Sequence, residues 1–340
     1  MRGQPASVGV TTSPTPTPLL RISDLTVEFP TAAGPARAVN LVNIDVARGE
    51  VLGVVGESGC GKSMTALAVL RLIPPPGRIS GGRILLDGQD LRSLPPIALQ
   101  AIRGKRIAMI FQEPMTALNP VLTVGDQIAE MLRRHVRHTR ADARTRTIEL
   151  LRLVGIPAPE RRWTEYPHQL SGGMRQRVMI AMAISCDPDI VFADEPTTAL
   201  DVTVQAQILG LLRDLRERLG MAMVFISHNL GVIAQVAHRV AVMYAGRIVE
   251  EATTQTLFTQ PLHPYTQGLL ASLPPADLRA GRLHRLEAIT GVVPALGAIP
   301  TGCAFTPRCP YAEVRCVTDP PFVDSGDAHR TRCWLVERAP

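Results

Sequence analysis

The chain has 340 residues, 46% of them hydrophobic, and a formal net charge of +6. That hydrophobic content can supply a sizeable core, which excludes a disordered protein, and the length allows one large domain with a smaller appendage. No apolar run reaches the roughly 18 residues that cross a bilayer, and the first residues lack the order of a signal peptide. We therefore expect a cytosolic protein. The positive charge suits an acidic membrane surface and a nucleic acid equally well.

The predicted elements begin after a tail. Residues 1–18 are rich in proline and threonine, and we expect a flexible segment because they cannot bury apolar surface. The apolar segments 20–29 and 38–46 predict two antiparallel strands. A buried strand at 51–55 and a helix at 64–72 follow.

The stretch GESGCGKS at 56–63 lies between that strand and that helix. Its glycines let backbone amides turn around phosphates, and the helix start adds the positive end of its dipole. Lys62 would neutralise the β- and γ-phosphates, and Ser63 would hold Mg²⁺. A purely structural glycine turn is the alternative. We expect ATP or GTP to contact a continuous run of residues, namely Gly56, Glu57, Ser58, Gly59, Cys60, Gly61, Lys62, Ser63 and Met64.

Further along the chain, short strands alternate with helices. Strands are predicted at 106–111, 190–193 and 222–226, which favours a mostly parallel, doubly wound sheet. Residues 123–162 have helical spacing and many charges, and we predict an all-helical insert there. A hairpin is predicted at 240–249. After Pro261 the composition shifts to proline, glycine and cysteine, which marks a separate C-terminal piece.

Two acids end the predicted strand at 190–193. Asp194 and Glu195 would meet the glycine-rich loop at the carboxyl edge of the sheet. Asp194 would orient Mg²⁺ and its water, and Glu195 would polarise the water that attacks the γ-phosphate. An exposed acidic strand end is the alternative.

The stretch LSGGMRQ at 170–176 resembles the signature sequence of the ATP-binding-cassette (ABC) family. Ser171, Gly172 and Gly173 open a predicted helix, where a hydroxyl and free amides form an anion site. In that family the signature contacts the γ-phosphate bound by a different cassette, so the resemblance implies a dimer. A serine that only caps its helix is the alternative.

Other stretches resemble further family elements. Gln112 resembles the glutamine loop, which links Mg²⁺ to the membrane partner. Residues 198–201 resemble the loop that touches the opposite subunit, including Asp201. His228 resembles the switch histidine that contacts the γ-phosphate, although Asn229 stands where an aspartate often follows.

The resemblance also implies a fold. It is a P-loop NTPase cassette over residues 19–260, with a RecA-like parallel sheet core, an antiparallel β subdomain and a helical subdomain at about 118–180. The two N-terminal strands would form a flap beside the nucleotide base. Phe29 is the candidate aromatic that stacks on adenine.

Two stretches indicate a branch of the family. FQEPMTALNP at 111–120 resembles the glutamine loop of ATPase subunits from oligopeptide and dipeptide importers, and PLHPYTQGLL at 261–270 resembles the start of their C-terminal extension. Nickel and related importers share this branch. The resemblance implies an ATP-hydrolysing subunit at the cytoplasmic face of the inner membrane. Its partners would be a second ATPase subunit, two permeases and an extracytoplasmic peptide-binding protein.

Two other classes of ABC protein are alternatives. A soluble ABC ATPase bound to DNA or ribosomes would suit the basic charge, but such proteins usually fuse two cassettes or carry long coiled coils, and neither is visible here. We therefore expect no nucleic acid. A regulatory cassette that only binds nucleotide conflicts with the complete catalytic set of this sequence.

Four of the six cysteines, Cys303, Cys309, Cys316 and Cys333, lie in the piece at 261–340, which is too small to form much core. Disulfides are disfavoured in a reduced cytosol, which leaves metal ligation. The residues by themselves leave open a [4Fe-4S] cluster, Zn²⁺ or unligated thiols, with His329 as a possible substitute ligand. The resemblance implies the cluster, since the peptide-importer subunits carry one there.

Overall fold

The structure is a computed structural model that describes residues 17–32, 34–198, 200–273, 288–326 and 328–336. The tail predicted at 1–18 lies almost wholly outside these residues, and so does Ala199 of the predicted subunit-contact loop. In the part of the chain that is described, no helix is long and apolar enough to cross a membrane.

The first of two sheets has four antiparallel strands in the order β2-β1-β4-β5. These are β1 (Leu20–Thr31), β2 (Gly34–Val46), β4 (Arg78–Leu86) and β5 (Gln89–Asp90). The pairing of β1 with β2 confirms the predicted antiparallel pair. Leu25, Val27 and Val39 are fully buried, in one apolar cluster with Ala66 of α1.

The main sheet has eight strands in the order β11-β12-β10-β9-β3-β8-β7-β6. These are β3 (Val51–Val55), β6 (Ile107–Ile110), β7 (Ile190–Asp194), β8 (Ala222–Ser227), β9 (Arg239–Tyr244), β10 (Arg247–Thr253), β11 (Val323–Asp324) and β12 (Arg330–Thr331). The strands from β9 to β6 in this order are parallel, and β10 turns back on β9. The predicted central strands and the predicted hairpin are confirmed.

Both faces of the parallel strands are covered. Every residue of β3, β7 and β8 is buried, as their continuous apolar runs predict. Val51 and Val55 of β3 join the apolar cluster that contains the buried residues of the helical insert, whereas Leu52 and Val54 join the cluster of α1 and the first sheet. Because successive side chains of β3 point to opposite faces of the sheet, this one strand contributes to both apolar clusters.

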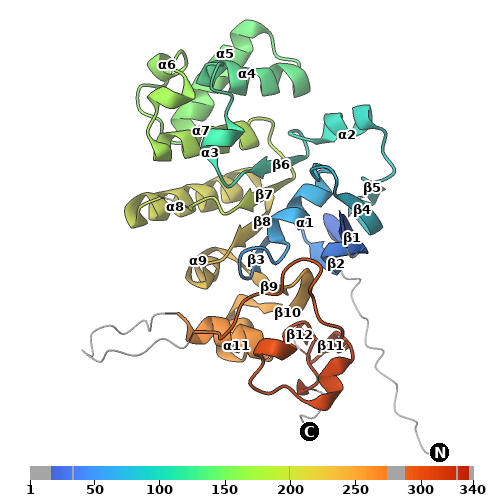
Figure 1. Ribbon diagram of the computed structural model, residues 1–340. Coiled ribbons are helices and arrows are strands. Elements are labelled where there is room, and N and C mark those ends of the chain that lie inside the picture. The colour runs from blue at the N-terminus through green and yellow to red at the C-terminus, as the bar shows by residue number, and fades with distance from the viewer. Residues whose placement is uncertain (1–16, 33, 199, 274–287, 327, 337–340) are drawn as a thin grey trace, which may run out of the picture.

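The helices form an insert and a covering layer. The predicted all-helical insert is confirmed, and Figure 1 shows it in green at the top of the view. Its helices are α3 (Pro114–Ala117), α4 (Val124–His135), α5 (Arg140–Leu153), α6 (Pro159–Arg162) and α7 (Gly172–Ile184), with a 3-10 turn, η1 (Pro167–Gln169). The others before the C-terminal piece are α1 (Lys62–Val69), α2 (Pro96–Ile102), α8 (Val202–Leu219) and α9 (Leu230–Val236).

Helix α1 begins two residues earlier than predicted and ends at Val69. Gly61 has a φ of 107°, which lets the chain turn directly into the helix at Lys62. Arg71 has a left-handed φ of 51°, so the helix cannot continue to Leu72.

The C-terminal extension, residues 254–336 as far as they are described, is joined to the main sheet. Its helices are α10 (Thr254–Thr259) and α11 (Pro264–Ala271), with 3-10 turns η3 (Thr306–Arg308) and η4 (Val314–Val317). Thr331 of β12 pairs with Glu250 of β10. Figure 1 shows the extension at the bottom, at the opposite end from the helical insert.

Candidate active site

The phosphate loop, residues 56–63, turns at glycines that other residues could not replace. Gly56 has a φ of +154°, and a Cβ built on it would lie 2.1 Å from the carbonyl oxygen of Met243. A Cβ on Gly61 would lie 2.5 Å from the carbonyl oxygen of Ala38. The loop is therefore packed against the strands on both sides, and only glycine fits at these two points.

Lys62 is 5% exposed and lies inside the turn of the loop. Its Nζ donates to the carbonyl oxygens of Gly56 at 2.7 Å and Glu57 at 3.0 Å. Cys60 is buried within the same loop. The loop thus holds the ammonium group of Lys62 inside its turn, where a positive charge favours the binding of phosphates.

Ser63 and Asp194 are brought together from α1 and the end of β7. The Ser63 hydroxyl donates to Asp194 Oδ1 at 2.9 Å. Burial raises the pKa of Asp194, and the hydrogen bond from Ser63 opposes that shift. A hydroxyl and a carboxylate side by side offer the oxygen ligands that Mg²⁺ prefers.

Glu195 is the centre of a second group. Its Oε1 lies 3.1 Å from Nδ1 of His228, and its Oε2 accepts from Thr198 Oγ1 at 2.8 Å and from Gln112 Nε2 at 3.3 Å. Burial alone would raise the pKa of Glu195, but the hydrogen bonds from His228 and Thr198 outweigh it and leave the pKa below its ordinary value. The carboxylate is therefore ionised at neutral pH and can accept a hydrogen bond from a water molecule.

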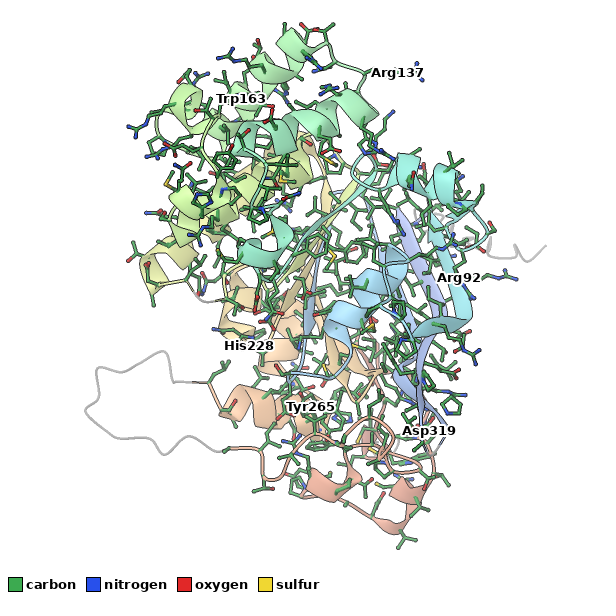
Figure 2. All side chains as sticks on the ribbon, turned by 45° about the horizontal axis from the view of Figure 1, so that its top comes forward. Arg92, Arg137, Trp163, His228, Tyr265 and Asp319 are labelled. Carbon is green, nitrogen blue, oxygen red and sulfur yellow. The ribbon has the colours of Figure 1, made fainter. Side chains whose placement is uncertain are left out.

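The topology explains why these residues meet. Strands β3, β8, β7 and β6 are neighbours and parallel, so the residues that follow them lie at one edge of the sheet. In Figure 2, His228 lies between the helical insert, marked by Trp163, and the extension, marked by Asp319. Thr198 was expected only as part of the subunit-contact loop, and its bond to Glu195 has no local signal in the sequence.

The signature residues lie at a different place, at the exposed start of α7. Ser171 caps the helix by accepting from the Met174 amide at 3.4 Å, and a Cβ built on Gly172 would have no atom within 4 Å. Asp201 similarly caps α8 by accepting from the Val204 amide at 2.9 Å. Both helix starts are open to solvent, so each is accessible to another subunit.

Phe29 packs on its own subdomain. A Cβ built on Gly77 would lie 2.5 Å from the ring of Phe29 and 2.8 Å from Ile73 Cγ2, so both side chains cover that glycine. The adenine contact of Phe29 stays a prediction. Asn229, where the family pattern often has aspartate, still caps α9 by accepting from the amides of Gly231 at 2.9 Å and Val232 at 3.3 Å.

The four C-terminal cysteines line one cavity of about 20 Å³. Burial raises the pKa of Cys303 and Cys309, and raises that of Cys333 to about 11. Four cysteines that line one small cavity match, in residue type, the ligands of a thiolate-bound metal group. Within the described residues, however, no three or more His, Cys, Asp or Glu side chains are arranged to hold a metal ion.

His329 does not line that cavity but pairs with Glu250. Its Nε2 lies 2.7 Å from Oε1 of Glu250, which is completely buried. The same carboxylate accepts from the amides of Leu262 at 2.7 Å and His263 at 3.0 Å. His329 therefore fastens the extension to β10 and does not line the cysteine cavity, unlike its predicted role as a substitute ligand.

Comparison with known proteins agrees with this geometry. The family model described as "ABC transporter" matches residues 39–198, and that described as "Oligopeptide/dipeptide transporter, C-terminal region" matches residues 249–316. The dimeric ATP-binding cassette solved in a post-hydrolysis state with ADP and phosphate has a TM-score of 0.63 and 28% identity, covering 69% of this chain and 98% of that one.

Relatives match along nearly the whole chain. A probable peptide ABC transporter ATP-binding protein of Sinorhizobium fredii is 52% identical, covering 93% of this chain and 94% of that protein. The oligopeptide transport ATP-binding protein OppD of Bacillus subtilis is 49% identical, with 94% and 89% covered. The dipeptide transport ATP-binding protein DppD of Haemophilus influenzae is 50% identical, with 93% and 94% covered. The chain belongs to the ATP-binding-cassette family, in the branch of the ATP-binding proteins of oligopeptide and dipeptide transporters.

Proposed function

We propose that this chain is the ATP-hydrolysing subunit of an importer of di- and oligopeptides. The observation that carries the proposal is the meeting of the phosphate loop, the Ser63–Asp194 pair and the Glu195–His228 pair at one edge of the main sheet. These groups provide what phosphoryl transfer requires, which is phosphate binding, a metal site and an orienting carboxylate.

Each group has a role in this proposal. The phosphate loop and Lys62 would hold the ATP phosphates, and Ser63, Asp194 and Gln112 would hold Mg²⁺ and its waters. Glu195 would accept a hydrogen bond from the attacking water, which orients a lone pair of the water oxygen toward the γ-phosphate. His228, whose Nδ1 lies 3.1 Å from Glu195, would contact the γ-phosphate.

We further propose that two ATPase subunits are needed for each site. Ser171, Gly172 and Gly173 present free amides at the start of α7, where the helix dipole favours an anion. Together with Asp201 they would contact ATP bound by a second subunit. The dimeric state of the similar cassette bound to ADP and phosphate supports this arrangement.

The transported substrate and the partners are inferred from the relatives. Peptide, oligopeptide and dipeptide transport appear in the descriptions of relatives that are 49–52% identical. We therefore expect a second ABC ATPase, two permeases and an extracytoplasmic peptide-binding protein as partners, at the cytoplasmic face of the inner membrane. Import of nickel or another small solute is the second candidate, and we expect no nucleic acid.

We propose that Cys303, Cys309, Cys316 and Cys333 ligate a metal group, a [4Fe-4S] cluster in preference to Zn²⁺. The support is that all four line one cavity. Such a metal group would stabilise the C-terminal extension, which has little hydrophobic core of its own. Anaerobically purified protein should contain iron and show a visible absorption band. A preparation that contains zinc and no iron would favour a Zn²⁺ site over the cluster. The absence of both metals would contradict the proposal.

Co-purification and uptake test the transport role. The tagged chain, isolated from gently solubilised native membranes, should bring down two permeases and a second ATPase. Cells lacking the chain should lose uptake of labelled di- and oligopeptides and regain it with the wild-type chain. Loss of nickel uptake with normal peptide uptake would favour the second candidate. Recovery with DNA or ribosomal proteins and without permeases would overturn the transport role.

A further inference from the structure

The C-terminal extension forms hydrogen bonds with the phosphate loop at Glu57. Arg308 Nη1 lies 2.6 Å from Glu57 Oε2, and Nη2 lies 3.0 Å from Oε1. This two-pronged geometry is the strongest form of an arginine–carboxylate pair. The Arg308 side chain is 3% exposed and that of Glu57 is 31% exposed, so solvent screens the pair much less than a surface ion pair.

The guanidinium group of Arg308 is held in place by Thr290 and Phe305 of the extension and by Tyr244 of β9. Its Nε donates to the carbonyl oxygen of Thr290 at 2.9 Å, and Nη1 lies 3.4 Å from the hydroxyl of Tyr244. The centre of the group lies 5.8 Å from the ring centroid of Tyr244 and 5.9 Å from that of Phe305. Because its orientation is already determined, Arg308 loses little freedom when it pairs with Glu57.

Tyr265 of α11 makes a second contact with the same residue. Its hydroxyl accepts from the backbone amide of Glu57 at 2.9 Å. The ring is completely buried, 4.6 Å from the ring of Tyr244 and 5.4 Å from that of Phe305. Figure 2 shows Tyr265 on the extension side of His228. The extension therefore holds both the backbone and the carboxylate of Glu57.

Glu57 in turn helps to position Lys62. The ammonium group of Lys62 binds the carbonyl oxygens of Gly56 and Glu57, so a shift of Glu57 would move two of its partners. We infer that Arg308 and Tyr265 are positioning residues of the nucleotide site. Acting through Glu57, they keep the phosphate loop in the shape that binds the ATP phosphates. This inference rests on the proposed function, because it needs the loop to bind ATP.

Nucleotide affinity is the quantity that separates this role from simple fastening of the extension. We would measure the Kd of the full chain for the Mg²⁺ complex of a non-hydrolysable ATP analogue. Arg308→Gln and Glu57→Gln should each raise Kd about tenfold or more, the size expected for losing a hydrogen-bonded charged pair. Tyr265→Phe should raise Kd by about fivefold, since it loses one bond to the loop. In turnover assays, KM for ATP should rise while kcat at saturating ATP stays within about threefold.

A double-mutant cycle tests whether the two residues act as one unit. The double variant Glu57→Gln with Arg308→Gln should bind no more weakly than either single variant, because they share one interaction. Arg308→Lys should recover only part of the affinity, since an ammonium group cannot make the parallel pair of bonds.

Arg330→Gln is the matched control. Arg330 also joins the extension to the core, through a 2.6 Å pair with Glu251, but it does not contact the phosphate loop. The Kd of the Arg330→Gln variant for the ATP analogue should equal that of the wild-type chain. If Arg308→Gln does not fold, Glu57→Gln and Tyr265→Phe carry the test, because the first site is partly exposed and the second keeps the ring. Folded variants with wild-type Kd would overturn the inference. A wild-type chain that does not bind the analogue would instead remove the proposed function.

Discussion

Glu195 has an unusual backbone conformation that its neighbours hold in place. Its φ is +45°, in the left-handed region that a non-glycine residue rarely adopts. Its amide donates to the carbonyl oxygen of Ile226 at 2.9 Å, and His228, Thr198 and Gln112 hold its carboxylate. Such local strain is maintained at functional sites by surrounding contacts. The carboxylate is thus oriented before a water molecule reaches it.

We predict that Glu195→Gln abolishes turnover without abolishing ATP binding. The amide keeps the size of the side chain but removes a charged acceptor, so hydrolysis should fall by about 10²- to 10⁴-fold. Phosphate release and nucleotide affinity would be measured on the same preparation. Glu217→Gln, at a carboxylate on α8 whose side chain is 58% exposed, should hydrolyse ATP normally. Unchanged hydrolysis by Glu195→Gln would remove this residue as the catalytic carboxylate.

Two glycines of the phosphate loop provide a matched pair of substitutions. Gly56→Ala forces a Cβ to within 2.1 Å of a backbone oxygen, so the strand or the loop must move. We predict a loss of about 3 kcal/mol in unfolding free energy, together with loss of ATP binding. Urea unfolding and analogue binding measure the two effects.

Gly59→Ala is the control for Gly56→Ala. Gly59 also has a positive φ, +79°, but a Cβ there would meet no atom within 4 Å. Only backbone strain is added, and we predict a loss of about 1 kcal/mol in unfolding free energy. Equal losses in the two variants would show that close packing is not what requires glycine at position 56.

At the scale of elements, parallel strands and helix starts divide the site into two halves. The residues after β3, β6, β7 and β8 gather at one edge of the main sheet. The start of α7 belongs to the helical insert and opens to solvent. In the proposed function, one half binds nucleotide and the other, which is open to solvent, contacts a second subunit.

Gly172→Asp tests that division. The new side chain has open space, and a carboxylate in the first turn of a helix is favourable, so stability should change by less than about 0.5 kcal/mol. The same negative charge would repel the γ-phosphate of a partner's ATP. We predict normal ATP binding by the isolated chain and loss of hydrolysis by the assembled transporter. Gly172→Ala, which fills the same space without charge, should keep most of the activity, and full activity of Gly172→Asp would contradict a role in trans.

At the scale of the whole molecule, the extension is part of the ATPase core. It adds β12 and β11 to the edge of the main sheet, and it surrounds the buried carboxylate of Glu250 with two backbone amides and His329. Arg308 and Tyr265 continue this contact as far as the phosphate loop. The extension and the nucleotide site should therefore respond to each other.

We predict that Glu250→Ala destabilises the whole chain. Removing the acceptor takes the partner from the amides of Leu262 and His263 and from His329 Nε2, which should lower the unfolding free energy by about 3–5 kcal/mol. Glu250→Gln keeps one carbonyl oxygen and should cost less. Urea unfolding of the full chain measures both, and a loss below about 1 kcal/mol for Glu250→Ala would show that the extension is held mainly by other contacts.

The sequence by itself determined the parts of the site that depend on short spacing. The phosphate loop is a run of neighbouring residues between a strand and a helix, so its pattern predicts both its shape and its chemistry. Asp194 and Glu195 could be assigned to the same edge because parallel strands end together. The strand pair at the N-terminus and the helical insert were likewise predictable from local hydrophobic patterns.

Only the tertiary structure decided the contacts between distant segments. Glu57 and Arg308 are 251 residues apart, and nothing in the local pattern of either residue indicates its partner. For the same reason His329, which is near the cysteines in the sequence, turns out to bind Glu250. Local propensities and motifs act over a few residues, whereas these pairs form because the folded chain places the extension beside both β10 and the phosphate loop.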